Sequence, residues 1–248
     1  MTMPKKTYLM CSTQRTGSTL LCRMLSDASI AGEPDEFFFY ILNAPRPPWT
    51  EWLRSPEKKA NFLKEMEKYT TSNGVFGANI MWKHFYYMVY QLRQLPAPEP
   101  LELDELLNQT FLKPAYILTT RRDKVRQAVS LWRAQQTGGW ISGTQWLSPF
   151  WTKNPVFDHE RIHTLVQEIK ADESAWNWFF RYYNIQPLKI VYEDFIVAPK
   201  DTLCSIFSHL GITVPDNVIL PEPKMKKQAD ELTELWVKKY YARKTHEK

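Results

Sequence analysis

The sequence has little cysteine: three residues of 248, Cys11, Cys22 and Cys204, with no C-x-x-C spacing between any two of them. Three cysteines cannot all pair with one another, and a thiolate zinc site needs closer spacing and more ligands. This excludes a disulfide-rich secreted scaffold. We expect all three to be small buried apolar residues in a reducing compartment.

Histidine is also scarce, and its five residues form no metal-ligand pattern in the sequence. His159 and His163 are four residues apart in a segment with helical periodicity, but a zinc site would need further ligands. We interpret them as a surface pair and expect no metal.

Long apolar runs are lacking as well. No stretch of 18 apolar residues is present, as a membrane-spanning helix would need. The first residues include Lys5 and Lys6, but only a short apolar segment with Cys11 and Ser12 follows, which is not a signal peptide. We therefore expect a cytoplasmic protein without stable membrane insertion.

Neither charge sign strongly dominates: 32 Lys and Arg against 27 Asp and Glu give a net charge of +5. This mild excess suits an anionic ligand. A nucleic-acid partner would need clustered basic residues, whereas the lysines here occur in short pairs, so we expect no nucleic acid. A chain of 248 residues can bury one large core, which indicates a single domain over residues 1–248.

The most informative stretch lies near the start. An extended apolar run from Lys5 to Ser12 precedes QRTGST (14–19), and a helical pattern follows. A strand that turns at Gly17 into a helix directs the first backbone N–H groups of that helix at one place, which binds anions. Arg15 adds charge, and the hydroxyls of Ser18 and Thr19 can donate hydrogen bonds. The Lys of the nucleotide-binding pattern GxxxxGK[ST] is missing. From the loop alone, an ordinary strand-turn-helix with no ligand is an equally good interpretation.

An acidic segment follows the first helix. Glu33, Asp35 and Glu36 crowd the approach to an aromatic run, where Gly32 and Pro34 prevent a regular element. One of the acids could cap a helix, but capping does not account for three.

A second strand-turn-helix unit spans 114–137. A β-rich run from Ala115 to Thr120 leads to a helix, so in a parallel sheet Arg121 would emerge beside the first anion loop. Ser130 lies off the apolar stripe of this helix and could face the same anion. We interpret Arg126 and Arg133 as residues of a solvated surface.

Further elements are expected along the chain. Periodicity predicts a strand at 74–82, a strand within PLKIVYEDF (187–195) and a final helix from Asp230. The loop from Gly138 to Phe157 is rich in Gly, Pro and Trp, which is typical of a lid or binding loop. A satellite core under a long loop is the alternative.

Taken together, strand-QRTGST-helix, AGEPDEFF (31–38) and strand-R-x-D-x₆-S-helix closely resemble the sulfotransferases, in particular the bacterial trehalose 2-sulfotransferase family. The resemblance extends to MW (81–82), QAVSLWRAQQT (127–137) and KKQADE (226–231). It implies an α/β, P-loop-containing three-layer sandwich with a mainly parallel central sheet flanked by helices. It also implies sulfonyl transfer from 3′-phosphoadenosine-5′-phosphosulfate (PAPS) to a carbohydrate hydroxyl, and a possible homodimer.

The resemblance also implies roles for individual residues. Glu36 would be the general base. The residues implied to bind the donor are Arg15, Thr16, Gly17, Ser18 and Thr19 at its 5′ end and Arg121 and Ser130 at its 3′-phosphate. On charge alone, we expect Lys227 to help stabilise the departing group. Those expected to contact the sugar are Gln14, Glu33, Asp35 and Trp52.

Two departures from the family pattern concern the acceptor. Asn79 stands where a relative carries Lys, and the loop between Tyr40 and Trp52 is short. The acceptor is therefore open between a trehalose-like sugar, a glycolipid and another hydroxylated metabolite. Two other functions compete: a P-loop kinase that uses ATP and Mg²⁺, and a non-catalytic nucleotide- or carbohydrate-binding module.

Overall fold

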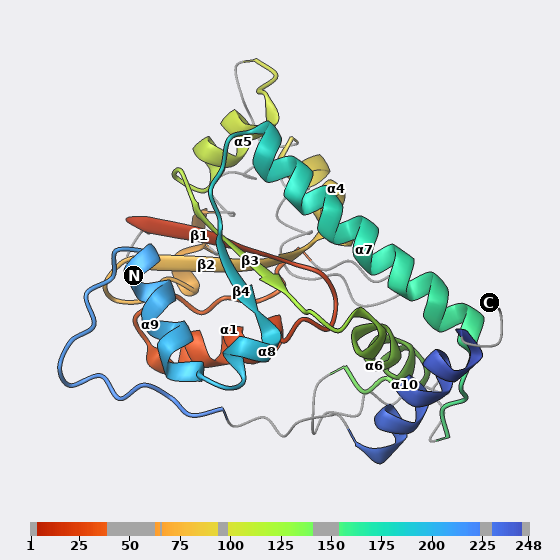
Figure 1. Ribbon diagram of the computed structural model, residues 1–248. Helices are drawn as coiled ribbons and strands as arrows, with labels where there is room; N and C mark the ends of the chain where they lie inside the picture. Colours follow the sequence, from red (N-terminus) through yellow and green to blue (C-terminus); the bar gives the residue numbers. More distant parts are fainter. Residues whose placement is uncertain are drawn as a thin grey trace.

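The computed structural model describes residues 4–38, 63–64, 66–93, 99–140, 154–223 and 230–244. Four parallel strands form one sheet in the order β2-β1-β3-β4 (Figure 1). The strands are β1 (Lys6–Ser12), β2 (Val75–Met81), β3 (Ala115–Thr120) and β4 (Leu188–Val191). In the register of the sheet, Met10 lies opposite both Asn79 and Ile117. The α/β fold with a parallel sheet is confirmed.

Helices cover both faces of this sheet because side chains alternate along buried strands. From β1, Leu9 and Cys11 pack with α4 (Trp82–Leu92), α5 (Leu103–Thr110) and the later turns of α7 (His159–Tyr182). Tyr8 and Met10 point the other way, toward α1 (Ser18–Ala28) and α9 (Pro199–His209). The three layers expected from the sequence are therefore present (Figure 1).

The carboxyl ends of all four strands lie along one edge of the sheet. The connections that leave this edge are the loop before α1, the start of α4, the turn before α6 (Lys124–Thr137), and α8 (Tyr192–Phe195). The strand expected over 187–195 was too long: it ends at Val191, where its pairing with β3 ends, and YEDF turns into α8.

Besides the side chains packed on the two faces of the sheet, a third hydrophobic cluster lies between α6, α7 and α10 (Glu231–Lys244). Helices α6 and α10 lie side by side in Figure 1. Arg126 forms an ion pair with Glu234, and Arg133 pairs with Asp230 at 2.6 Å. Our interpretation of these two arginines as merely solvated was therefore wrong, because both bind α10 to α6.

Two expectations about scarce residues need correction. The ring of His159 is buried and stacks on Tyr240 at a centroid distance of 4.8 Å, and His163 Nδ1 lies 2.9 Å from Tyr240 Oη. They are not a surface pair, because α10 covers this face of α7. Cys11 and Cys22 are buried as expected, but Cys204 is exposed on α9.

None of the helices in the described ranges combines the length and apolar character needed to cross a bilayer. Most of the expected lid, residues 141–153, lies outside the described residues, as does the loop from Tyr40 to Trp52.

The third cluster gives a direct test of how α10 is held. Trp236 is 2% exposed, whereas its neighbour Leu235 is 46% exposed. Trp236→Ala leaves a cavity and should lower the free energy of unfolding by about 3–5 kcal/mol in urea denaturation. Leu235→Ala is the matched control and should change it by about 0.5 kcal/mol or less. Equal effects would show that α10 does not pack as described.

Candidate functional site

The loop between β1 and α1 leads into a helix whose first backbone N–H groups have no partner within the helix itself. Arg15 has φ 66° and Gly17 has φ 83°, both in the left-handed region, so the chain turns sharply into the helix. Gly17 is the N-cap of α1 and has no side chain to cap it, whereas Asp123 and Asp158 cap α6 and α7. The open first turn of α1 is therefore available to an anion.

Tyr192, the first residue of α8, lies directly against this loop. A Cβ at position 17 would come within 2.6 Å of its ring, so close approach as well as the positive φ requires glycine there. The same ring lies 4.5 Å from the guanidinium carbon of Arg121. Our sequence reasoning did not single out Tyr192. Its only signal was its position directly after a strand, at the edge where ligands bind.

Hydrogen bonds to β3 and α6 hold the loop between β1 and α1 in place. Thr16 Oγ1 donates to the carbonyl of Thr13 at 3.1 Å and lies 3.0 Å from Thr119 Oγ1. Gln127 Nε2 donates to Thr13 Oγ1 and, at 2.6 Å, to the carbonyl of Gln14. The hydroxyl of Thr16 is thus directed inward, so a ligand contact from this residue would come from its backbone.

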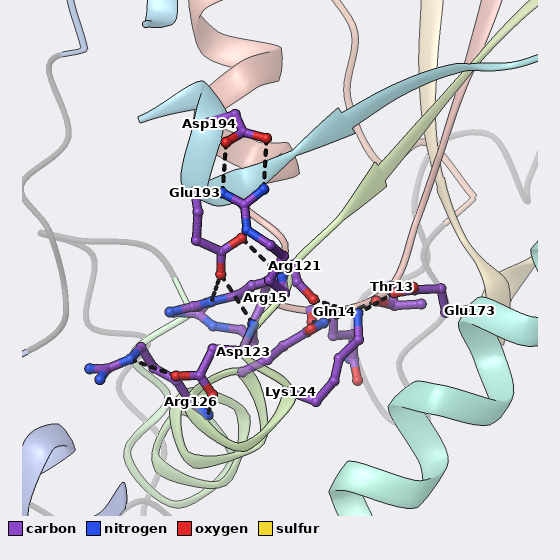
Figure 2. Close-up of polar contacts among 12 residues, drawn as sticks. Thr13, Gln14, Arg15, Arg121, Asp123, Lys124, Arg126, Glu173, Glu193 and Asp194 are labelled. Atoms are coloured by element: carbon purple, nitrogen blue, oxygen red, sulfur yellow. Dashed lines mark hydrogen bonds and ion pairs between the residues drawn. The ribbon is translucent and has the colours of Figure 1, made fainter. Parts of the chain in front are cut away.

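The structure brings together three residues predicted to bind the donor. Arg15 Nε donates to Ser130 Oγ at 3.0 Å, its Nη1 donates to the carbonyl of Trp140 at 2.6 Å, and Arg121 Nη1 donates to the carbonyl of Arg15 at 3.3 Å. Figure 2 shows Arg15 and Arg121 close together beside the turn after β3. Two guanidinium groups, from the connections that follow β1 and β3, therefore face one site.

These two positive charges are held at an energetic cost. Burial, and then the charge of Arg121, lower the pKa of Arg15 to about 10. Burial also lowers the pKa of Arg121, which is 8% exposed. Its buried Nε has no hydrogen-bond partner among the described residues. A buried donor without an acceptor is costly, and an anionic ligand would supply that acceptor.

The acidic segment reaches the same edge by running beside β2. Gly32 has φ 75°, and a Cβ there would lie 2.9 Å from the backbone nitrogen of Gly77. Farther along, the backbone N–H of Asn79 donates to the carbonyl of Asp35 at 2.9 Å. The segment thus follows β2 in the strand's own direction and brings Glu36 to the carboxyl edge.

Glu36 is half-buried there, and its surroundings act on its pKa in opposite directions. Burial, and then the negative charge of Asp35, raise the pKa of Glu36 to about 7, while the positive charge of Arg15 opposes the rise. A carboxylate with a pKa near neutrality is suited to accept a proton as a general base.

The other predicted site residues fall into three groups. Ser18 is buried and Thr19 half-buried in the first turn of α1, with Gln14 half-buried in the loop before it. Glu33 and Asp35 are exposed on the acidic segment. Trp52 and Lys227 lie outside the described residues, so their predicted roles stay predictions.

Asn79, the departure noted in the sequence, lies in β2 next to this segment. Its Oδ1 accepts a hydrogen bond from Ser12 Oγ at 2.8 Å. Its buried Nδ2 has no partner in the part of the chain that the structure describes.

Comparison with known proteins gives a consistent result. The model of the Stf0 sulphotransferase family matches residues 7–243. A trehalose 2-sulfotransferase of Mycolicibacterium smegmatis is 27% identical over 94% of this chain and 93% of its own length. One of Mycobacterium tuberculosis is 28% identical over 95% and 94%. The crystal structure of a sulfotransferase from Alicyclobacillus acidocaldarius covers 97% of this chain and 92% of its own, with 13% identity and a TM-score of 0.49.

The raised pKa of Glu36 predicts how stability depends on pH. The folded state keeps a proton on Glu36 up to about pH 7, whereas the unfolded chain releases it near the ordinary glutamate pKa of 4.5. Wild-type stability should therefore fall relative to Glu36→Gln as pH rises through this window, by on the order of 3 kcal/mol in total.

Urea denaturation of both proteins at pH 4 and pH 8 measures this difference. Glu33→Gln removes the same charge from an exposed position of the same segment and is the matched control. A gap between wild type and Glu36→Gln that is equal at both pH values would contradict the assigned environment of Glu36.

Proposed function

This chain belongs to the Stf0 sulphotransferase family, and on that premise we propose that it transfers a sulfonyl group from PAPS to a hydroxyl of a carbohydrate. One observation carries the proposal. The anion loop with its arginines and Glu36, whose pKa is about 7, lie at the same edge of the sheet. A pure binding site for an anionic nucleotide has no need of such a carboxyl group.

The proposed donor fits the charges at this edge. The open first turn of α1 and Arg15 would bind the 5′-phosphosulfate, with the Ser18 and Thr19 segment providing further donors. Arg121, whose Nε has no hydrogen-bond partner among the described residues, and Ser130 would bind the 3′-phosphate. Lys227 would add a further positive charge.

The reaction requires positioning more than covalent chemistry from the protein. The bond between sulfur and the oxygen of the departing bisphosphate breaks as a new bond forms from sulfur to the acceptor oxygen. Glu36 would take the proton of the acceptor hydroxyl, which is a poor nucleophile while it keeps that proton. Arg15 and the N–H groups of α1 would stabilise the charge left on the bisphosphate. We propose that this transfer needs no metal.

A trehalose-like sugar is the first candidate acceptor, because both curated relatives are described as trehalose 2-sulfotransferases. Gln14, Glu33, Asp35 and Trp52 would bind its other hydroxyls. The backbone of Asn79 pairs with the segment that carries two of these acids, and its Nδ2 has no hydrogen-bond partner among the described residues. A glycolipid with a similar sugar is the second candidate. A cytoplasmic location and a homodimeric state remain predictions.

The experiment that tests the proposal is incubation of the protein with PAPS and trehalose in the presence of a metal chelator. Mass spectrometry should find trehalose carrying one added sulfonyl group, together with an equal amount of adenosine 3′,5′-bisphosphate. If trehalose is inert, a panel of sugars and glycolipids follows. Phosphate transfer from ATP that requires Mg²⁺, with no use of PAPS, would instead support a kinase.

Replacement of the proposed base separates chemistry from binding. Glu36→Gln keeps the size of the side chain but cannot accept the proton, so kcat should fall by about 10²–10⁴-fold while affinity for adenosine 3′,5′-bisphosphate stays nearly unchanged. For the wild type, kcat/KM should decrease about tenfold per pH unit below pH 7, because protonated Glu36 is inactive.

Asp35→Asn is the matched control for this variant. It removes the neighbouring charge that raises the pKa of Glu36, so its kcat should stay far above that of Glu36→Gln and the acidic limb of its kcat profile should shift to lower pH, while its KM for the sugar should rise because Asp35 is also proposed to bind the acceptor. Equal losses of turnover and nucleotide affinity in Glu36→Gln would show that Glu36 is structural.

A further inference from the structure

Glu193, the second residue of α8, has no place in the mechanism above, yet it contacts the turn after β3, and its neighbour Tyr192 lies against Gly17 in the first anion loop. We propose that Glu193 is a positioning residue that holds Arg121 in place and thereby makes the site selective for nucleotides with a 3′-phosphate. This inference rests on the proposed donor.

Both carboxylate oxygens of Glu193 accept hydrogen bonds from the turn after β3. Oε2 accepts a hydrogen bond from the backbone N–H of Arg122 at 2.9 Å, and Oε1 accepts one from that of Asp123 at 3.2 Å (Figure 2). These are the two residues that directly follow Arg121. The carboxylate therefore fixes the direction in which Arg121 leaves the strand, in a turn that carries no glycine to define it.

Glu193 also acts on the guanidinium group itself. Its Oε1 lies 3.9 Å from Arg121 Nε, while Tyr192 stacks against the guanidinium and the carbonyl of Arg15 accepts from Nη1. A carboxylate, a ring and a carbonyl thus restrain Arg121 from three directions. At 3.9 Å the carboxylate is too far to accept a hydrogen bond from Nε, and no other acceptor for Nε lies among the described residues. The guanidinium group of Arg121 is therefore held in one orientation but keeps a donor for a ligand, as a binding residue should.

Glu193 carries the charge that this role requires. Burial disfavours its ionised form, but the backbone N–H groups of Arg122, of Glu193 itself and of Asp123, together with the charge of Arg121, outweigh that effect and lower its pKa. An uncharged Gln would lose the attraction to Arg121, and its amide NH₂ would face a backbone N–H that now donates to an oxygen.

The adjacent Asp194 provides a matched control. It forms a two-pronged ion pair with the side chain of Arg122 at 2.6 and 2.8 Å, but both side chains are exposed. This pair joins the same helix to the same turn without touching Arg121. A general loss of contact between α8 and the turn would therefore also appear in Asp194→Asn.

The test is calorimetric titration of wild type, Glu193→Gln and Asp194→Asn with adenosine 3′,5′-bisphosphate and with adenosine 5′-monophosphate. Glu193→Gln should bind the bisphosphate about tenfold more weakly and the monophosphate as the wild type does. Asp194→Asn should bind both within about twofold of wild type. An equal loss for both nucleotides in Glu193→Gln, or no loss for either, would overturn the inference.

Two further variants separate the possible causes. In an Arg121→Ala background, Glu193→Gln should cause no further loss of bisphosphate affinity, because its effect passes through Arg121. An additive loss would overturn the inference. Glu193→Asp keeps the charge and both oxygens on a shorter side chain, and should show a smaller loss with the same selectivity. Glu193→Asp replaces Glu193→Gln in these titrations if the latter does not fold.

The proposed function can fail separately in the same experiment. A wild type that binds the bisphosphate no better than the monophosphate would overturn the proposed donor together with this inference. A wild type that prefers the bisphosphate, with an unselective Glu193→Gln, would overturn this inference alone.

Discussion

The close placement of two arginines, Arg121 buried and Arg15 half-buried, at the carboxyl edge of a parallel sheet is the constraint on which this site depends. β1 and β3 are neighbours, so the chains leaving them bring Arg15 and Arg121 into contact through one carbonyl. Their mutual repulsion and burial oppose folding, and the protein offsets this through Ser130, the carbonyl of Trp140 and the ring of Tyr192. A ligand with two anionic groups would remove the remaining repulsion between the two arginines. Because the fold already holds these charges in place, the ligand does not have to bring them together when it binds.

The same arginines connect donor binding to the proposed base. Arg15 lowers the pKa of Glu36, whereas burial and Asp35 raise it. An anionic donor that neutralises Arg15 would leave Glu36 under the influence of burial and Asp35, and so make it a stronger proton acceptor. The carboxylate would then be most basic once the donor is in place. This ordering follows from the charges alone and requires no movement of the chain.

Much of the fold and part of the site could be predicted from the sequence. Alternating and helical periodicity located β1, α1, β3 and α6 closely, and the parallel topology predicted that Arg121 would emerge beside Arg15. What the sequence could not show were contacts between distant segments. The docking of α10 on α6 makes ion-pair anchors of Arg126 and Arg133, which look like surface residues. Tyr192 and Glu193 were read as part of a strand, because YEDF has no local feature that ends β4. The raised pKa of Glu36 depends on burial and on two neighbouring charges, and the motif alone could not provide it.

The central claim is that the edge of the sheet binds a 3′-phosphorylated adenine nucleotide without a metal. Calorimetric titration of the purified protein with adenosine 3′,5′-bisphosphate in chelator, beside ATP with Mg²⁺, tests it most directly. The account predicts tight binding of the bisphosphate that is unchanged when Mg²⁺ is added, and weak binding of ATP. Preference for ATP with Mg²⁺ would contradict the account and support a kinase that retains this fold.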